Sequence, residues 1–258
     1  MVPGFDDWRS PPAGRVTPPA TAIDVWWLDL AEPVVEFGAL APRLTTAESI
    51  EVARFRRPED QLQRAAARIF LRWVLGRHQL GCSPRHVHWQ RDDRGRPHLS
   101  LPAEDGDRWD FNLSHAGSHV LVALASGVRI GVDVEIATTV ETASLARICA
   151  TETERTWLAD APDEPANRTR FFRLWTMKEA VLKCQGWGLG CDPRHCSLDV
   201  GEGSARLRMP STPEQYYSVA TLPFAGEVFG AVAWAGREER SIRGWRAPSG
   251  WLEEAGAD

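Results

Sequence analysis

The chain has 258 residues, 43% of them hydrophobic and 25% charged, and a formal net charge of −5 at pH 7. This composition is typical of a globular protein with a core, in one large or two small domains, and the negative charge argues against a general nucleic-acid binder. Every hydrophobic stretch is interrupted by charge, Pro or Gly before about 20 residues, so no membrane span is predicted.

The N-terminal segment is rich in proline. Residues 1–21 contain five prolines and no continuous apolar run, so we expect a flexible leader rather than an export signal, and a cytoplasmic location. Without an export signal, the five cysteines favour free thiols in a reducing compartment. Cys184, Cys191 and Cys196, with His195 nearby, do not have the paired spacing of a zinc site.

Residues 22–126 are expected to form an N-terminal α+β half. Its predicted elements, in chain order, are the strand 23–30, the helices 45–55 and 60–76, and the strands 86–90, 111–113 and 120–125. We expect Gly81 to end the longer helix. In that helix Arg64, Arg68 and Arg72 follow one another at spacings of four on one face, which is either an anion-binding strip or a solvated face.

Ser126 and Gly127 divide the chain, and the elements of residues 127–240 follow in a similar order. They are the strand 130–136, the helices 142–149 and 151–159, a longer helix that includes 175–183, and the strands 197–200, 216–221 and 228–234. We expect a second α+β half here, followed by a loosely held C-terminal tail at 241–258.

The strand 130–136 carries two carboxylates on one face. Asp133 and Glu135 alternate with apolar residues, so both side chains point to the same side, with Cα atoms roughly 6.6 Å apart. Gly131 lies on that face and would leave room for a ligand. Like charges so close need a counter-charge, so the strand either contributes to a metal site or has a solvated polar face.

The only two lysines of the chain, Lys178 and Lys183, lie in one predicted helix on either side of Glu179. Glu179 and Lys183 are one turn apart and Trp175 is one turn before Glu179, so these three share one stripe of the helix. The stripe is either an ordinary ion pair or part of a site that faces the strand carboxylates. With those two carboxylates, Glu179 would complete a set of oxygens suited to Mg²⁺.

Two further motifs have simpler interpretations. Ser114 and His115 might suggest a hydrolase, but neighbouring residues of an extended segment point apart, and the chain has no Gly-x-Ser-x-Gly elbow. Gly186, Gly188 and Gly190 follow a helix rather than a strand, which is typical of a helix end and a loop instead of a dinucleotide-binding turn.

Three groups of residues occur in a distinctive order: Phe111-Asn112-Leu113-Ser114-His115, Gly131-Val132-Asp133-Val134-Glu135, and Trp175-x-x-Lys178-Glu179-Ala180-x-x-Lys183 with Gly186 and Gly188 after it. Together with Gly95-Arg96-Pro97 upstream, they resemble the Sfp-type 4′-phosphopantetheinyl transferases over about residues 54–190. The resemblance implies an α+β fold of two similar halves, a pseudo-dimeric arrangement, with the active cleft between them.

The resemblance also implies an activity. Such an enzyme, a holo-carrier-protein synthase, moves the 4′-phosphopantetheine arm of coenzyme A to a serine hydroxyl of an apo acyl or peptidyl carrier protein and releases 3′,5′-adenosine bisphosphate. Asp133, Glu135 and Glu179 would hold Mg²⁺, or Mn²⁺ in its place. Glu179 and Lys183 would be catalytic. Glu179, or a metal-bound water that it orients, would take the proton of the carrier serine, and Lys183 would bind the phosphates or protonate the departing oxygen. Carriers of fatty-acid, polyketide or nonribosomal peptide synthases are the implied partners, with no nucleic acid or membrane, and the protein would act as a monomer.

The coenzyme-binding residues that the resemblance implies are Arg54, Arg57, Arg96, Ser114, His115 and Lys183. The sequence departs from the family at Glu48 and Glu51, where basic residues are common, which leaves the 3′-phosphate to the arginines at 54, 56 or 57. Lys178 faces the apolar side of its helix and is either a structural salt-bridge partner or a catalytic group.

Two other functions fit the same acids. One is a Mg²⁺-dependent phosphohydrolase of a small nucleotide, which would transfer to water and need no protein acceptor. The other is a non-catalytic binder of the coenzyme or of the carrier protein.

Overall fold

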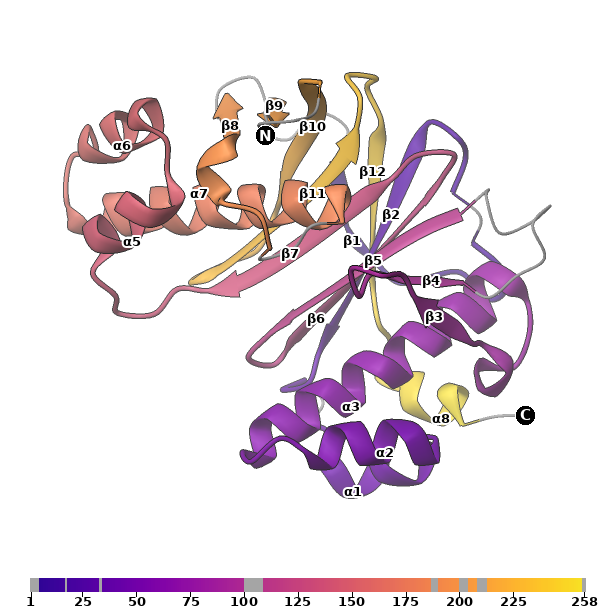
Figure 1. Cartoon of the computed structure of the whole chain (residues 1–258). Helices are drawn as coiled ribbons and strands as arrows, with labels where there is room; N and C mark the ends of the chain where they lie inside the picture. Colours follow the sequence, from indigo (N-terminus) through magenta and orange to yellow (C-terminus); the bar gives the residue numbers. More distant parts are fainter. Residues whose placement is uncertain are drawn as a thin grey trace.

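A computed structural model describes residues 5–16, 18–32, 34–99, 109–186, 190–199, 204–207 and 213–256. The fold is α+β, as predicted, with two five-stranded sheets and a small hairpin (Figure 1). The strands are β1 (Phe5–Arg9), β2 (Ala22–Asp29), β3 (Trp89–Arg91), β4 (Pro97–Leu99), β5 (Trp109–Ala116), β6 (His119–Ser126), β7 (Ile130–Ile136), β8 (Cys196–Asp199), β9 (Ser204–Leu207), β10 (Gln215–Leu222), β11 (Val228–Ala235) and β12 (Ser241–Arg246).

The helices lie outside the two sheets. They are α1 (Phe37–Leu40), α2 (Thr46–Ala53), α3 (Pro58–Trp73), α5 (Thr142–Cys149), α6 (Glu152–Ala159), α7 (Glu164–Gln185) and α8 (Trp251–Ala255). A π-helical segment, Val74–Leu80, continues α3, and Gly81 ends it at φ 70°, as predicted. Short 3₁₀ turns occur at Ala41–Arg43, Pro84–His86 and Pro193–His195. No helix of the described residues combines the length and apolar character that crossing a membrane would require.

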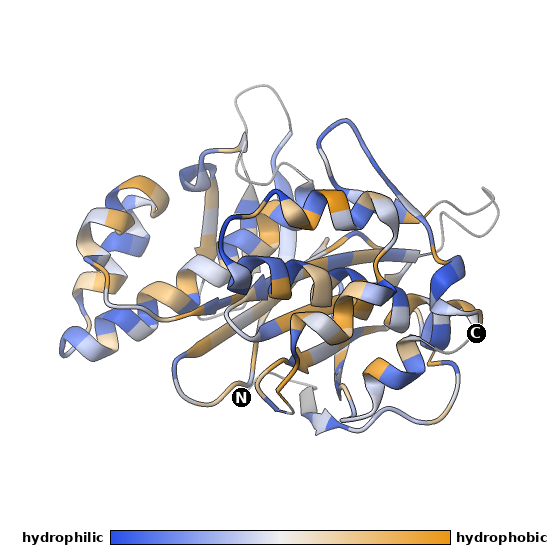
Figure 2. Ribbon diagram, turned by 90° about the horizontal axis from the view of Figure 1, so that it is seen from below, coloured by the Kyte–Doolittle hydropathy of each residue, from blue (hydrophilic) through white to orange (hydrophobic). Residues whose placement is uncertain are grey.

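The fold has four layers, which are α3, the first sheet, the second sheet and α7, and buried hydrophobic side chains fill the space between them. One core packs α3 against the first sheet, a second packs α7 against the second sheet, and a third lies between the sheets. In β2, Trp26 and Leu28 face α3 while Ile23 and Val25 face the other sheet, the alternation that a strand covered on both sides requires. In Figure 2 hydrophobic colouring accordingly follows many of the inner strands, while the outer loops are mainly hydrophilic.

The two sheets have related strand orders, β1-β12-β2-β6-β5 and β7-β11-β10-β9-β8. In the first, β2 pairs with the second strand of the β5–β6 hairpin, and in the second β7 pairs with the second strand of the β10–β11 hairpin, all antiparallel. A long helix, α3 or α7, stands between the first strand and the hairpin in each case. The strand β2 and the hairpin β5–β6 are thus paired in the same way as the strand β7 and the hairpin β10–β11.

The C-terminal residues belong to the first sheet, so the predicted loose tail at 241–258 is wrong. β12 lies parallel to both β1 and β2 and fills the edge of β2 that β6 leaves open. Trp245 and Trp251 are buried in the core under α3. The predicted leader 1–21 is also wrong where β1 pairs with β12. Parts of three predicted segments lie outside the described residues: residues 1–4 and 17 of the leader, Gly188 of the glycine motif and Val200 of the strand 197–200.

Both ends of the helix α7 are capped. The side chain of Asp163 accepts a hydrogen bond from the Ala166 N–H at 2.8 Å, and Pro165 stands in the first turn. Gly186 closes the other end at φ 84°, as expected for a glycine after a helix. The helix therefore presents a fixed sequence of side chains to the strand β7.

Gly131 allows α7 to lie directly on β7. A Cβ atom at this position would stand 2.0 Å from the Ala180 carbonyl oxygen and 2.4 Å from the Cys184 nitrogen. The predicted room for a ligand at Gly131 is therefore wrong, because the helix backbone fills that space. The close approach brings the face of β7 that carries the carboxylates against the stripe of α7 predicted to face them.

We expect Gly131→Ala to lower the free energy of unfolding by more than about 3 kcal/mol, because the helix must move away from the strand. Gly38→Ala is the matched control, since a Cβ there has nothing within 4 Å and the φ angle is ordinary. Urea denaturation of both variants measures the difference. Equal stabilities of the two variants would show that the helix backbone does not need the glycine.

Side chains of β5 join the two sheets at their facing edges. The Asp110 carboxylate accepts the Ile130 N–H at 2.7 Å, and the Asn112 amide oxygen accepts the Val132 N–H at 3.0 Å. Ser114 Oγ continues the series by accepting the Val134 N–H at 3.4 Å. Because these partners recur at every second residue of both strands, they fix the register of β5 against β7. That register places Ser114 next to Asp133.

Candidate functional site

A pocket of about 800 Å³ lies where α2, α3 and the β3–β4 hairpin meet β5, β7 and α7. Its lining residues include the charged side chains Glu48, Glu51, Arg64, Arg68, Arg72, Arg91, Asp133, Glu135, Glu179 and Lys183, together with Ser114, His115, Trp89 and Trp175. Both halves of the fold therefore contribute to it, and the two ends differ in the charges that they present.

Six of the residues predicted for the site line this pocket: Ser114, His115, Asp133, Glu135, Glu179 and Lys183. The three acids come from two elements, β7 and α7, and the tight packing at Gly131 brings these elements together. Three other predicted residues, Arg54, Arg57 and Arg96, are not among the lining residues. The sequence thus identifies the acidic end of the pocket better than the opposite end.

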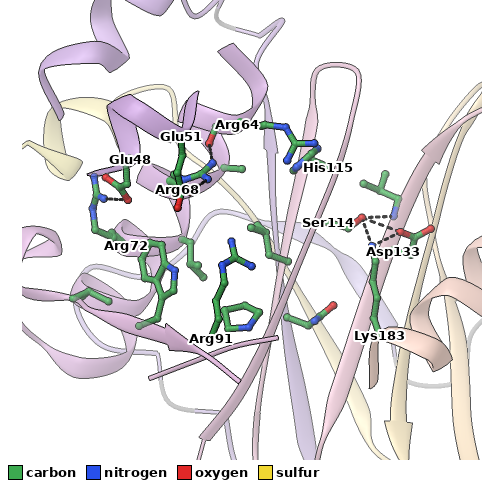
Figure 3. A pocket seen from close by; sticks show the side chains of 18 of the residues that line it. Glu48, Glu51, Arg64, Arg68, Arg72, Arg91, Ser114, His115, Asp133 and Lys183 are labelled. Atoms are coloured by element: carbon green, nitrogen blue, oxygen red, sulfur yellow. Dashed lines mark hydrogen bonds and ion pairs between the residues drawn. The ribbon is translucent and has the colours of Figure 1, made fainter. Parts of the chain in front are cut away.

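Lys183, Ser114 and Asp133 form a closed hydrogen-bonded group (Figure 3). The Lys183 ammonium donates to Asp133 Oδ1 at 2.6 Å and to Ser114 Oγ at 2.8 Å. The Ser114 hydroxyl in turn donates to Asp133 Oδ1 at 2.9 Å. Each member comes from a different element, so this group connects α7, β5 and β7 at the floor of the pocket. It also fixes the one carboxylate oxygen that faces the ammonium.

The other two carboxylates lie in the same electrostatic field. The Trp175 indole N–H donates to Glu135 Oε1 at 3.1 Å and so orients that side chain. Burial raises the pKa of Glu135, and the nearby Asp133 carboxylate raises it further. Burial, with Asp133 next in importance, raises the pKa of Glu179 to about 7. The predicted stripe of Trp175, Glu179 and Lys183 is confirmed, since all three line the pocket.

Two buried oxygens at this end have no hydrogen-bond partner: Oδ2 of Asp133 and Oε1 of Glu179. Both residues are more than nine-tenths buried. An unpaired buried carboxylate oxygen is costly, and three carboxylates face only the single ammonium of Lys183 here. Among the residues that the structure describes, His, Cys, Asp and Glu side chains nevertheless do not gather into a ready metal site of three ligands. The ammonium of Lys183 takes one oxygen of Asp133 instead.

The guanidinium of Arg96 bonds to groups within the protein and is not among the residues that line the pocket, while its contact with the coenzyme stays a prediction. It pairs with Asp110 at 2.6 Å and donates to the carbonyl oxygens of Ile130 at 2.7 Å and of Lys183. With only 8% of the residue exposed, these acceptors inside the protein surround it. Arg96 therefore holds the C-terminal end of α7 against β7. The sequence could not distinguish this role from a phosphate contact, because arginine suits both.

Arginines and acids alternate at the opposite end of the pocket, as Figure 3 shows. Arg68 forms an ion pair with Glu51 at 2.5 Å, and Arg72 forms one with Glu48. The predicted arginine strip is therefore real but partly neutralised. Arg54 and Arg57 are exposed and are not among the lining residues, and their contact with the coenzyme stays a prediction.

Sequence reasoning missed the residues that β3 contributes, Trp89 and Arg91. Arg91 donates to the Gly95 carbonyl oxygen at 2.8 Å, which ties it to the turn of the hairpin. A signal existed in the alternation of Val87, Trp89 and Arg91 along a short polar strand beside an arginine-rich helix. Only the fold shows that this hairpin covers the same pocket.

His115 and Arg64 are neighbours on the wall between the two ends (Figure 3). Burial, and after it the positive charges of Arg64 and Lys183, lowers the pKa of His115 to about 4. The ring is therefore neutral at physiological pH, and its Nδ1 is buried without a partner. Arg64 stacks over the ring of Phe55, with Cζ 3.9 Å from the ring centroid. Together they offer positive charge and hydrogen bonds to an anion.

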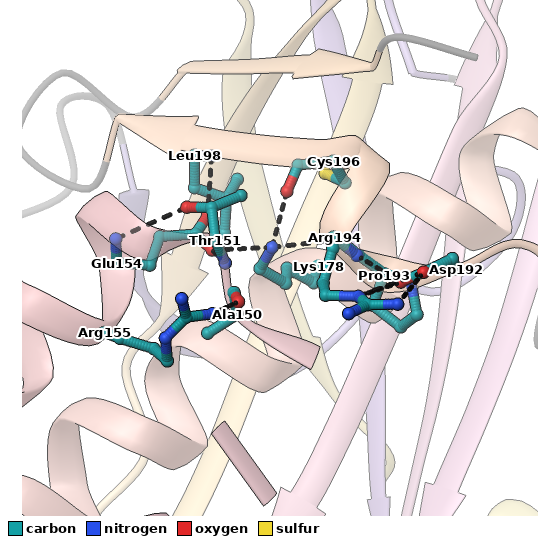
Figure 4. A network of polar contacts seen from close by, with 10 residues as sticks. All are labelled: Ala150, Thr151, Glu154, Arg155, Lys178, Asp192, Pro193, Arg194, Cys196 and Leu198. Atoms are coloured by element: carbon teal, nitrogen blue, oxygen red, sulfur yellow. Dashed lines mark hydrogen bonds and ion pairs between the residues drawn. The ribbon is translucent and has the colours of Figure 1, made fainter. Parts of the chain in front are cut away.

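Lys178 does not line the pocket but belongs to a network of polar contacts within the protein (Figure 4). Its ammonium pairs with Glu154 at 2.7 Å and donates to the carbonyl oxygens of Pro193 and Cys196. Glu154 also accepts the Leu198 N–H at 2.9 Å. Both charged side chains are almost completely buried. The network joins α6, α7 and β8, which favours the salt-bridge interpretation of Lys178 over the catalytic one.

We expect Glu154→Gln to destabilise the protein by about 3–5 kcal/mol, because it leaves the buried Lys178 ammonium without a counter-charge. The double variant Glu154→Gln with Lys178→Met should regain much of that loss, since no uncompensated charge remains. Denaturant unfolding of the wild type and the two variants gives the comparison. If the single variant is as stable as the wild type, the pair does not carry this role.

Comparisons with known proteins agree with the geometry. A family model described as the 4′-phosphopantetheinyl transferase superfamily matches residues 129–228, and one described as the N-terminal part of 4′-phosphopantetheinyl transferase matches residues 33–127. The chain is similar to the 4′-phosphopantetheinyl transferase HetI of Nostoc sp., with 35% identity over 65% of this chain and 70% of the relative. A putative 4′-phosphopantetheinyl transferase of Synechocystis sp. is 32% identical over 77% of this chain and 82% of its own length. The 4′-phosphopantetheinyl transferase psf-1 of Bacillus pumilus is 26% identical over 73% and 78%, respectively. The chain therefore belongs to the 4′-phosphopantetheinyl transferase superfamily and is an enzyme of that class.

Proposed function

We propose that the protein transfers the 4′-phosphopantetheine arm of coenzyme A to a serine hydroxyl of an apo carrier protein, with Mg²⁺, and releases 3′,5′-adenosine bisphosphate. One observation carries the proposal: three carboxylates and one ammonium line the same end of a pocket, and two buried carboxylate oxygens there are unpaired. Family membership and the names of the relatives support the transfer of phosphopantetheine.

The residues present fit a divalent cation. Asp133 Oδ2 and Glu179 Oε1 are buried acceptors without donors, and Glu135 lies beside them on β7. Hard oxygen ligands and excess negative charge are what Mg²⁺ and Mn²⁺ prefer. Asp133, Glu135 and Glu179 would hold the ion. When bound, it polarises the diphosphate and stabilises the negative charge that develops on the departing phosphate.

Glu179 is the proposed base. Its carboxylate lies in the pocket beside the proposed path of the serine, and in the protein without metal burial raises its pKa to about 7. In the transfer, the carrier serine oxygen bonds to the phosphorus next to the pantetheine arm, and the bond from that phosphorus to the bridging oxygen breaks. The electron pair leaves with the adenosine bisphosphate, and the serine proton goes to Glu179.

The basic side chains on the wall would hold the diphosphate. Lys183 already points its ammonium between Asp133 and Ser114, and it can donate to a phosphate oxygen from the same position. Arg64 and His115 lie next to this group and add positive charge and a hydrogen bond. The Ser114 hydroxyl, which keeps Lys183 and Asp133 in place, completes the set.

Two features of the chain support a self-contained enzyme. The same order of strand, helix and hairpin in both halves suggests two similar folds, so we propose a pseudo-dimeric arrangement within one chain. The pocket draws its charged residues from both halves, so a monomer would possess a whole site. Carrier proteins of fatty-acid, polyketide or nonribosomal peptide synthases are the proposed partners.

Incubation with coenzyme A, Mg²⁺ and a panel of apo carrier proteins tests the proposal. Intact mass spectrometry should show a gain of about 340 Da on the carrier serine, the mass of the phosphopantetheine group that this reaction class attaches. Release of the bisphosphate without a mass gain would indicate hydrolysis, and neither signal would leave a non-catalytic binder.

A further inference from the structure

The end of the pocket opposite the three acids is nearly balanced in charge. This nucleoside end consists of Glu48, Glu51, Arg68, Arg72 and Arg91, from α2, α3 and β3. It takes its name from the proposed function, on which the inference rests: if the diphosphate lies at the acidic end, the nucleoside of the coenzyme extends toward these residues. Trp89, Val87 and Leu71 line the same region and offer apolar surface to a base.

Two of the three arginines there already form ion pairs. Glu51 Oε2 accepts from Arg68 at 2.5 Å, and Glu48 pairs with Arg72, whose guanidinium also donates to the Arg43 carbonyl oxygen at 2.5 Å. These pairs hold the guanidinium groups in bonds within the protein. A phosphate that approached Arg68 or Arg72 would have to displace a carboxylate or lie beside it.

The acids are part of the folded frame. Glu48 completes a capping box at the start of α2, because its side chain accepts the Thr45 N–H at 2.9 Å while the Glu48 N–H donates to the Thr45 hydroxyl. Glu51 lies one turn of helix after it, and the positive charges of Arg91 and of Arg54, which is outside the pocket lining, also act on it. Among the lining residues of this end, three guanidinium groups thus face two carboxylates, which leaves one net positive charge on the lining.

A phosphate dianion on the nucleoside would turn that net charge from one positive to one negative. The gain from the arginines is then offset by repulsion from Glu48 and Glu51, so the extra phosphate contributes little to binding. We propose that this enzyme uses 3′-dephospho-coenzyme A about as well as coenzyme A. The charge balance at the nucleoside end, rather than the shape of the pocket, sets this tolerance.

The chemistry with the smaller substrate is the same. The carrier serine oxygen forms its bond to the phosphorus next to the pantetheine arm, and the bond from that phosphorus to the bridging oxygen breaks. The serine proton passes to the proposed base. The electron pair leaves with adenosine 5′-monophosphate in place of the 3′,5′-bisphosphate, while the carrier gains the same mass.

Two measurements on the purified full chain test the inference. The first compares kcat/KM for the two coenzymes with one apo carrier and Mg²⁺; a ratio of about tenfold or less is expected, and a larger preference for coenzyme A would overturn the inference. The second measures the dissociation constants of the two coenzymes by calorimetry without carrier. A ratio of about tenfold or less is again expected, and a larger ratio in favour of coenzyme A would overturn the inference. If no carrier is modified from either coenzyme, the proposed function fails, and the calorimetric ratio still decides the inference.

A variant that removes one negative charge distinguishes this electrostatic explanation from a pocket whose shape fails to distinguish the two coenzymes. Glu51→Gln frees Arg68 from its ion pair, and because Glu51 is half exposed the change should leave the fold intact. We expect it to shift the kcat/KM ratio toward coenzyme A by about fivefold to tenfold. Glu59→Gln, an exposed acid on α3 outside the pocket lining, changes the net charge equally and should leave the ratio unchanged. Identical ratios in both variants would show that Glu51 does not set the tolerance.

Discussion

Replacing Asp133 with asparagine is expected to lower kcat/KM for transfer by at least about a thousandfold, because a neutral amide can neither hold a divalent cation nor balance Lys183. Asp133 is 3% exposed and accepts from Lys183 and Ser114 through Oδ1, while its Oδ2 has no partner. This carboxylate accepts hydrogen bonds from both α7 and β5, and so helps to connect these elements to β7 at the floor of the pocket. A steady-state assay with saturating Mg²⁺ measures the loss.

The variant must be compared with one that changes charge without touching the site. Asp93→Asn removes one exposed acid from the turn of the β3–β4 hairpin and should keep full activity. Thermal unfolding in EDTA distinguishes loss of function from loss of fold, and we expect Asp133→Asn to stay folded because the amide keeps the shape of the side chain. A folded Asp133→Asn protein with wild-type turnover would disprove the assignment of this residue.

Glu179→Gln is the second large effect, with an expected loss of at least about a hundredfold in kcat, since the change removes a proposed ligand and the proposed base together. The shape of the side chain is kept, so binding of coenzyme A should weaken less than turnover. Separate determination of kcat and KM over a range of coenzyme concentrations gives the result. If KM rises while kcat is unchanged, Glu179 acts in binding alone.

The pH dependence of the free energy of unfolding tests the raised pKa of Glu179 independently of activity. In the folded protein without metal the pKa of Glu179 is about 7, above the value of 4.5 for an ordinary glutamate. The folded state therefore binds the Glu179 proton more tightly than the unfolded state does. This contribution to the free energy of unfolding is complete below about pH 4.5, and it is lost as the pH rises toward 7, by up to about 3 kcal/mol. In EDTA, Glu179→Gln should thus gain stability over the wild type between pH 5 and pH 8. A constant difference across that range would contradict the raised pKa.

The acidic end of the pocket was predictable because it depends on local patterns. Alternation along β7 puts Asp133 and Glu135 on one face, and helical spacing puts Glu179 and Lys183 on one stripe of α7. Two elements with such faces can share a site, the resemblance to a family implies that they do, and both elements line one pocket. The buried position of Lys178 also followed from its place on the apolar side of α7.

Long-range packing explains what could not be predicted. The sequence pattern indicates room for a ligand at Gly131, whereas the space there is filled by the backbone of α7, about fifty residues later in the chain. The C-terminal strand β12 gave a weak pattern of its own, and its position depends on the open edge of β2 more than two hundred residues earlier. Strand β5 was predicted too short because Asp110, Asn112 and Ser114 interrupt the apolar pattern, although these polar residues are the ones that join the sheets.

The central claim, that Asp133, Glu135 and Glu179 hold one divalent cation, is tested most directly by a crystal structure with Mn²⁺ and coenzyme A, using the anomalous signal of the metal. The expected result is a single peak in the pocket, within about 2.5 Å of a carboxylate oxygen from each of the three residues and of a phosphate oxygen. A peak elsewhere, or a bound coenzyme with no peak among these carboxylates, would contradict the assignment.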